Sequence, residues 1–114
     1  ILSRHPFVAT DIHHRCGKQD CRHIAAKFEN FELHNLYIPA GGDIPDVKKN
    51  EKYKHKLDFV DEMTDWLAAE RNPKEPMVLV GDLNIAPLEH DVWSHKQLLD
   101  VVKQNRKERI LRKD

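Results

Sequence analysis

The sequence has few cysteines, no net charge and no long apolar run. Its 114 residues include two cysteines, too few for a disulfide framework, so we expect a reducing compartment, the cytoplasm. Lys and Arg total 19, as do Asp and Glu, so net charge gives no argument for a polyanionic partner. No apolar run approaches the ~20 residues of a membrane span, and no signal peptide is expected at the start.

The apolar share is small too. Hydrophobic residues make up 39% of the chain and charged residues 33%, and the mean hydropathy is −0.71. This composition is typical of one small domain with a thin core. The first residues, Ile1–Ser3, resemble the end of a strand, as though the chain were entered in mid-strand, and residues 7–10 are candidates to extend it beyond Pro6.

Residues 11–21 are mostly polar and predict an exposed surface loop. The potential metal ligands in or beside it are His13, His14, Cys16, Cys21 and His23. Thiolates and imidazoles together suit zinc, but the C-x4-C spacing has no second pair of cysteines after it. We therefore expect a solvated loop with two unpaired thiols and no stoichiometric zinc. A zinc-binding module at residues 13–23 remains the alternative.

Two alternating runs follow. Arg22–Glu29 and Phe31–Ile38 each alternate in side-chain character, and Asn30 between them suggests a tight turn. They predict an antiparallel hairpin, which Pro39 ends.

The period then changes to that of a helix, from Glu51 to Arg71. The apolar positions at helical spacing are Leu57, Val60, Met63 and Leu67, with Phe59 and Trp66 beside them. Most charged residues of this segment, Lys56 included, should lie outside the apolar face. The pair Asn72–Pro73 should end the helix.

A short apolar run, Met77–Val80, predicts a buried strand that ends at Gly81. Asp82 and Asn84 follow and, being two residues apart on an extended chain, should point to the same side. A strand, a helix and a strand favour parallel pairing, so Tyr37, which ends the earlier strand, should share an edge of the sheet with Asp82. Taken singly, these residues also fit ordinary turn and packing roles.

Ser94 is a plausible N-cap for a short helix that carries apolar residues up to Val102. Residues 103–114 are rich in Lys and Arg. We favour a solvated helical end there over a contact with a phosphate backbone.

Residues 35–39, Asn-Leu-Tyr-Ile-Pro, and residues 80–87, Val-Gly-Asp-Leu-Asn-Ile-Ala-Pro, together resemble the exonuclease III family of abasic-site endonucleases, within the endonuclease/exonuclease/phosphatase superfamily. Lys-Leu-Asp-Phe at residues 56–59 also resembles the helix between those motifs. The resemblance extends from about Ile1 to Val102. It implies an α/β fold, a four-layered α/β sandwich of mixed sheet and helices, and Mg²⁺-dependent (or Mn²⁺-dependent) hydrolysis of phosphodiester bonds in DNA.

The resemblance also implies roles for three residues. Tyr37 is similar to the active-site tyrosine whose hydroxyl contacts the attacked phosphate. Asp82 is similar to the carboxylate that positions or deprotonates the attacking water, and Asn84 to the amide that steadies the phosphate. Asp82 and Asn84 are also secondary candidates for metal contacts. Arg22 is assigned no role. The implied substrate is double-stranded DNA with abasic sites or 3′ ends.

Several residues of the family pattern have no counterpart in this sequence. They are an N-terminal Asn, the main metal-binding Glu, a C-terminal Asp and the Asp-His pair. We therefore expect residues 1–114 to be an incomplete domain, the middle segment and about half of the sandwich, and inactive on its own. The intact enzyme should be a monomer, whereas the segment should be prone to association. The alternatives are a related phosphatase or phospholipase, and a non-catalytic remnant that binds nucleic acid or protein.

Overall fold

The structure is a computed structural model and describes residues 1–70, 74–86, 88–91 and 94. The elements in chain order are β1 (Ala9–Arg15), β2 (Lys18–Lys27), β3 (Glu32–Tyr37), α1 (Glu51–Glu70), β4 (Met77–Asp82) and a 3-10 turn (Glu89–Asp91). They divide into two compact units, one of Ile1–Tyr37 with Glu62–Asp82 and one of Ile38–Asp61 with the residues from Leu83 onward. The expected α/β class is confirmed.

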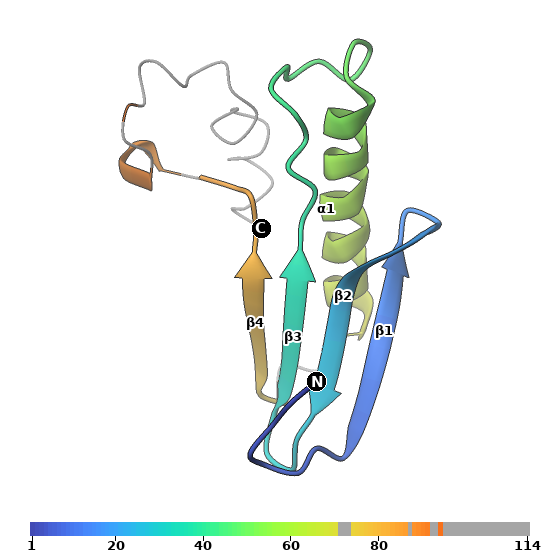
Figure 1. The fold of residues 1–114 in the computed structure, drawn as a ribbon, viewed down its shortest axis with the longest axis vertical. Coiled ribbons are helices and arrows are strands. Elements are labelled where there is room, and N and C mark those ends of the chain that lie inside the picture. Colours follow the sequence, from blue (N-terminus) through green and yellow to red (C-terminus); the bar gives the residue numbers. More distant parts are fainter. Residues whose placement is uncertain (71–73, 87, 92–93, 95–114) are drawn as a thin grey trace. The chain divides into compact units, whose positions relative to one another are not determined.

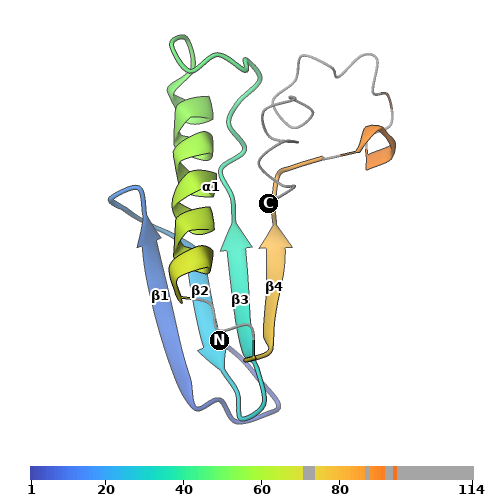
Figure 2. The same ribbon diagram turned by 180° about the vertical axis from the view of Figure 1, so that it is seen from behind.

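The first unit contains a mixed four-stranded sheet. Its strand order is β1-β2-β3-β4, and Figure 1 shows the strands side by side. The pairs β1–β2 and β2–β3 are antiparallel, whereas β3 and β4 are parallel. Figure 2 shows β1 and β4 at the two edges of this sheet. The predicted hairpin and the predicted parallel pair are therefore both confirmed.

The first strand corrects the prediction of a loop at residues 11–21. Asp11–Arg15 belong to β1, Lys18–Cys21 belong to β2, and Cys16 and Gly17 turn the chain between them with φ of 55° and 66°. Backbone pairing holds this hairpin, with Ile12 opposite Ile24, so polar side chains do not prevent it. The strand end expected at Ile1–Ser3 does not form, because β1 begins only at Ala9.

The last strand corrects a second expectation. Met77–Val80 was expected to be buried, but Val78, Leu79 and Val80 are 43%, 42% and 42% exposed. The reason is the strand order, which gives β4 one neighbour, β3, and leaves it at an edge of the described sheet.

The helix α1 begins after an asparagine cap. Asn50 Oδ1 accepts hydrogen bonds from the backbone nitrogens of Lys52 (3.1 Å) and Tyr53 (3.3 Å), as an N-cap does. The part of α1 in the first unit packs on one face of the sheet, where Met63 is buried and the Trp66 ring lies 5.2 Å from that of His34. The helical prediction is confirmed up to Glu70.

The buried face of α1 differs from the predicted one. In the second unit it is formed by Tyr53, Lys56 and Phe59, each 0% exposed, whereas Leu57 and Val60 are half-buried. Lys56 was expected outside. Its ammonium group is buried because it donates a hydrogen bond of 2.7 Å to the carbonyl oxygen of Asn84, and lies 3.5 Å from that of Ala40.

Three predictions fall on residues that the structure does not describe: the helix end at Asn72–Pro73, the helix that follows Ser94, and the basic end at residues 103–114. Within the described part of the chain, none of the helices is long and apolar enough to cross a membrane.

Candidate functional site

Tyr37 and Asp82 end neighbouring parallel strands. They are partners in the β3–β4 register and are both exposed, so the two side chains share one edge of the sheet, as predicted. Gly81 makes this pairing feasible. Its φ is 129°, and a Cβ atom there would overlap the carbonyl oxygen of Leu36 on β3. A glycine at this position lets β4 run close against β3 up to Asp82.

Arg22 also lies at this edge, although no role was predicted for it. Its guanidinium carbon is 4.9 Å from the centroid of the Tyr37 ring, and Nη1 donates a 3.2 Å hydrogen bond to the Tyr37 carbonyl oxygen. Asp20 holds the other side of the group, with a 2.6 Å contact between Nε and Oδ2. The strand register would have indicated Arg22. His23 pairs with Leu36 in the antiparallel β2–β3 pair, so the preceding Arg22 lies beside Tyr37.

Asn84 belongs to the second unit, where it is 8% exposed. Its φ is 50°, in the left-handed region that asparagine tolerates better than most residues. Its Nδ2 donates a 2.8 Å hydrogen bond to the carbonyl oxygen of Ile38, and its own carbonyl oxygen accepts one from Lys56. The backbone and side chain of Asn84 are thus both fixed by residues that follow β3 or lie on α1.

The side-chain oxygens of Asp82 suit a hard cation. Mg²⁺ is usually held by one or two carboxylates together with substrate phosphate and water. Asp82 supplies one exposed carboxylate at a strand end. This carboxylate fits a partial contribution to a magnesium site, in which the substrate or other ligands complete the coordination.

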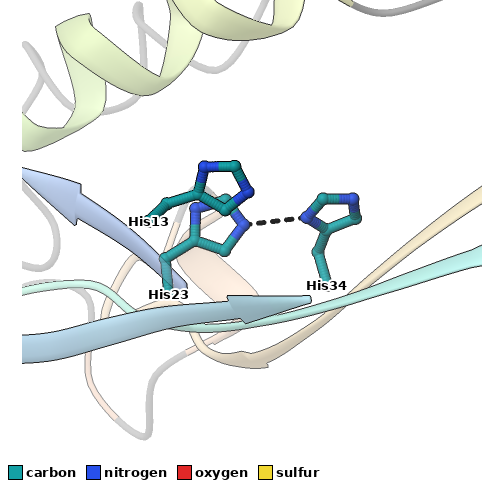
Figure 3. A group of neighbouring side chains, drawn as sticks. All are labelled: His13, His23 and His34. Carbon is teal, nitrogen blue, oxygen red and sulfur yellow. Dashed lines mark hydrogen bonds between the residues drawn. The ribbon is translucent and has the colours of Figure 1, made fainter. Parts of the chain in front are cut away.

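Three histidines that could bind a metal ion also lie together, although they were not predicted as a group. His13 on β1, His23 on β2 and His34 on β3 lie together on the face of the sheet that Trp66 covers (Figure 3). One nitrogen from each lies within 4.8 Å of the others. The His13 and His23 rings stack at 4.4 Å, and His23 Nε2 lies 2.8 Å from His34 Nδ1.

Hydrogen bonding around Arg15 assigns the protons in this cluster. The Arg15 guanidinium only donates, so its 3.2 Å contact makes His23 Nδ1 an acceptor and places the His23 proton on Nε2. That proton is donated to His34 Nδ1, which places the His34 proton on Nε2. Among the described residues, His34 Nε2 is a buried nitrogen without a hydrogen-bond partner.

Both buried histidines favour the neutral form. Burial, followed by electrostatic interactions with His13 and Arg15, lowers the pKa of His23 from 6.5 to about 3. Burial also lowers the pKa of His34, although nearby Glu32 opposes this shift. Neutral imidazoles are the form that binds a metal.

The cysteines of the sequence-based zinc alternative do not belong to this cluster. Cys16 and Cys21 form no disulfide, and the group of candidate ligands among the described residues consists of His13, His23 and His34. His34 lies far from residues 13–23 in sequence. In the β2–β3 register His34 pairs with Ala25, which lies two residues from His23 on the same face of β2, and this brings His34 beside His23.

Comparison with known proteins matches residues 1–102 to the Endonuclease/Exonuclease/phosphatase family. A comparison with curated proteins gives no match. Among solved structures, an AP endonuclease from Archaeoglobus fulgidus is similar, with 27% sequence identity and a TM-score of 0.75. The match covers 90% of this chain and 40% of that chain.

Two further structures are similar in fold. One is the 3′ phosphatase NExo from Neisseria bound to a product DNA hairpin, with 23% identity, a TM-score of 0.81, and coverage of 97% of this chain and 42% of that chain. The other is a 3′-5′ exonuclease from Neisseria meningitidis, with 24% identity, a TM-score of 0.81, and coverage of 97% and 43%. This chain therefore spans about two fifths of the length of these structures. Because the family match extends over residues 1–102, the chain belongs to the endonuclease/exonuclease/phosphatase family.

Proposed function

We propose that this chain is the middle segment of an exonuclease III-type enzyme, a DNA-repair nuclease of the cytoplasm that hydrolyses phosphodiester bonds with Mg²⁺ or Mn²⁺. The observation that carries the proposal is the pairing of Tyr37 with Asp82 at one edge of the sheet, beside the guanidinium of Arg22. A phenol, a carboxylate and a cation at one edge suit a phosphate ester and an attacking water.

Tyr37 and Arg22 would act on the phosphate. The Tyr37 ring is 53% exposed and is backed by the Arg22 guanidinium, so its hydroxyl group is free to be oriented toward a ligand while the ring stays in place. Arg22 would bring its guanidinium N–H groups to the same edge, with Asp20 paired to its Nε. Asp20 offsets the charge of Arg22 and the chain has no net charge, so the hydrogen-bonding groups of this edge carry the argument rather than its potential.

Asp82 would accept the proton of the attacking water or orient it, and Asn84 would donate a hydrogen bond to the phosphate. Family members generally depend on a divalent metal, and Asp82 and Asn84 are our candidates in this chain for secondary contacts with it. A bound divalent ion would neutralise the charge that develops on the phosphate oxygens. The remaining metal ligands would come from residues outside this sequence.

Duplex DNA is the substrate we favour over a phosphoinositide or a sphingolipid. The support is the similarity to an AP endonuclease, to a 3′ phosphatase bound to a product DNA hairpin and to a 3′-5′ exonuclease. We infer that duplexes with abasic sites or with 3′ ends are the targets, and that the intact enzyme acts as a monomer.

A substrate panel tests this proposal. The intact protein that contains these residues is incubated with an abasic-site duplex, a duplex with a recessed 3′ end, a duplex with a 3′ phosphate, a phosphoinositide and sphingomyelin, each with Mg²⁺ or with a chelator. We expect metal-dependent turnover of the duplexes alone. Turnover of a lipid and no duplex would replace the proposal by a related phosphatase or phospholipase. No turnover, with DNA or protein binding retained, would support a non-catalytic remnant.

The 114 residues alone are expected not to cleave the abasic duplex, because the family's main metal-binding Glu and its Asp-His pair have no counterpart among them. The matched control is the same segment with Asp82→Asn. Cleavage by the unmodified segment that disappears in this control would show that the missing residues are not needed.

A further inference from the structure

We propose that His13, His23 and His34 form a binding site for one divalent transition-metal ion of the zinc class, separate from the magnesium chemistry proposed at the strand ends. The three side chains come from neighbouring strands, β1, β2 and β3, so a bound ion would fasten the β1–β2 hairpin to β3 (Figure 3). This inference does not depend on the proposed nuclease function.

The donor atoms select the metal. Each of the three residues offers an imidazole nitrogen, and nitrogen ligands suit zinc, copper or nickel, whereas magnesium and calcium prefer oxygen. Three histidines with one further position, taken by water or another ligand, is an established zinc arrangement. The oxygen donors of Asp82 and Asn84 and the nitrogen donors of this cluster therefore call for different ions.

The spacing of the nitrogens is close to that of a coordinated set. With Zn–N bonds of about 2.0–2.1 Å and tetrahedral angles, ligand nitrogens lie roughly 3.4 Å apart. Here His23 Nε2 and His34 Nδ1 are 2.8 Å apart, and the three ligand atoms all lie within 4.8 Å of one another. Metal binding would therefore require side-chain rotations that part the His23 and His34 nitrogens and bring the third nitrogen closer.

The tautomers of the cluster already suit a metal bound at His34 Nδ1. His34 is 2% exposed, and among the described residues its Nε2 has no hydrogen-bond partner. The hydrogen bonds from Arg15 to His23 and from His23 to His34 end at this N–H. Buried polar atoms in folded proteins are nearly always paired, so the metal-free cluster is not fully satisfied by its own hydrogen bonds. Binding of a metal through His34 Nδ1 keeps the proton on Nε2, which is the tautomer that these hydrogen bonds already assign.

Two charged neighbours make the proposal specific. When His23 binds a metal through Nε2, its proton moves to Nδ1, which then requires an acceptor. Arg15 cannot accept, so its guanidinium, 3.2 Å away, must withdraw on binding. Asp11 acts in the opposite direction, because its Oδ2 lies 3.6 Å from His13 Nε2 and a carboxylate behind a ligating histidine favours binding.

The test is a titration of metal-free protein with Zn²⁺ by calorimetry and with Co²⁺ by visible absorption, in the Asp82→Asn background so that the proposed magnesium site does not contribute. We expect one equivalent of either ion, the visible bands of tetrahedral Co²⁺, and a higher melting temperature in Zn²⁺ than in chelator.

Matched variants locate the ligands. His13→Gln, at the least buried of the three positions, should weaken Zn²⁺ binding by at least about 100-fold, which exceeds the usual effect of an outer-shell change. Asp11→Asn should weaken it by about 10-fold. Arg15→Gln should tighten it, since glutamine offers an oxygen to His23 Nδ1–H and removes a positive charge. The exposed neighbour His14, changed to Gln, and the double change Cys16→Ser with Cys21→Ser should leave binding unaltered.

Each variant is compared with its own metal-free form, so a loss of stability is not mistaken for a loss of binding. The proposal is overturned if the protein binds no stoichiometric Zn²⁺ or Co²⁺. It is also overturned if His13→Gln and His14→Gln bind equally well, or if the cysteine changes abolish binding and His13→Gln does not. The cluster would then be a hydrogen-bonded part of the core, or the thiols would be the ligands.

Discussion

The strand ends at Tyr37 and Asp82 and the histidine cluster under Trp66 lie in the same sheet but differ in exposure and in donor chemistry. At the strand ends the side chains are exposed, the donors are oxygens, and each residue belongs to a short sequence motif. In the cluster, His23 and His34 are buried and the donors are nitrogens. The strand-end residues can be found from sequence motifs, whereas the histidines are brought together only by the pairing of the strands. Substitutions in the two groups should therefore have different effects.

Changes at the strand ends should affect chemistry more than folding, because exposed side chains contribute little to stability. Changes in the cluster should affect folding, because buried polar side chains are costly once they lose their partners.

Among the single substitutions, Gly81→Ala is expected to cost the most stability, because it should disrupt the strand ends through the backbone. The added methyl group overlaps the Leu36 carbonyl oxygen on β3, and φ of 129° is unfavourable for alanine, so we expect a loss of about 3 kcal/mol or more in the free energy of unfolding. Denaturant unfolding measures it.

Gly17→Ala is the matched control for that substitution. Gly17 also has a positive φ, 66°, but a Cβ atom there meets nothing within 4 Å. Its cost should be near 1 kcal/mol, the penalty for the backbone conformation alone. Equal losses for the two alanine substitutions would show that β4 does not need the close approach to β3.

Tyr37→Phe in the intact protein should lower the rate of DNA cleavage by about 10- to 100-fold. The phenylalanine keeps the ring beneath the Arg22 guanidinium and removes only the hydroxyl, whose hydrogen bond to a charged phosphate is typically about 1.5–3 kcal/mol. Single-turnover cleavage of an abasic duplex measures the rate. An unchanged rate would remove Tyr37 from the site, and an altered melting temperature would contradict the separation of chemistry from folding.

Acid should destabilise the metal-free protein through His23. The unfolded histidine takes up a proton near pH 6.5, whereas the folded one has a pKa of about 3, so the unfolded state binds more protons between these values. The free energy of unfolding should therefore fall as the pH decreases from about 6.5 to 3, by up to about 1.4 kcal/mol per pH unit from this residue.

Unfolding by urea in chelator across this pH range measures the slope. The variant His23→Gln should have a smaller slope than the unmodified protein, and His14→Gln, at an exposed position, should have the same slope. If the slope is unchanged in His23→Gln, the buried neutral histidine is not its source.

Much of the architecture could be predicted from the sequence because local patterns specify it. The alternation of residues 22–29 and 31–38 predicts the β2–β3 hairpin, and helical spacing predicts α1. The strand, helix and strand order then predicts that Tyr37 and Asp82 share an edge. The roles of Tyr37, Asp82 and Asn84 come from the resemblance alone and stay predictions.

The missed features depend on contacts between distant residues. The polar composition of residues 11–15 concealed β1, since backbone pairing with β2 does not require apolar side chains. His34 joins His23 only through the β2–β3 register. Lys56 is buried because carbonyl groups of Ala40 and Asn84, 16 and 28 residues away, receive its ammonium group. No local pattern reports such partners.

The substitution Asp82→Asn in the intact protein tests whether the active site lies at these strand ends. The amide keeps the shape of the carboxylate but loses the proton acceptor, so single-turnover cleavage of an abasic duplex with Mg²⁺ should fall by about 10²- to 10⁴-fold. Affinity for the duplex, measured in the same samples by anisotropy, and the melting temperature should stay nearly unchanged. Full cleavage activity in Asp82→Asn would exclude this residue from the chemistry and contradict the assignment of the active site to these strand ends.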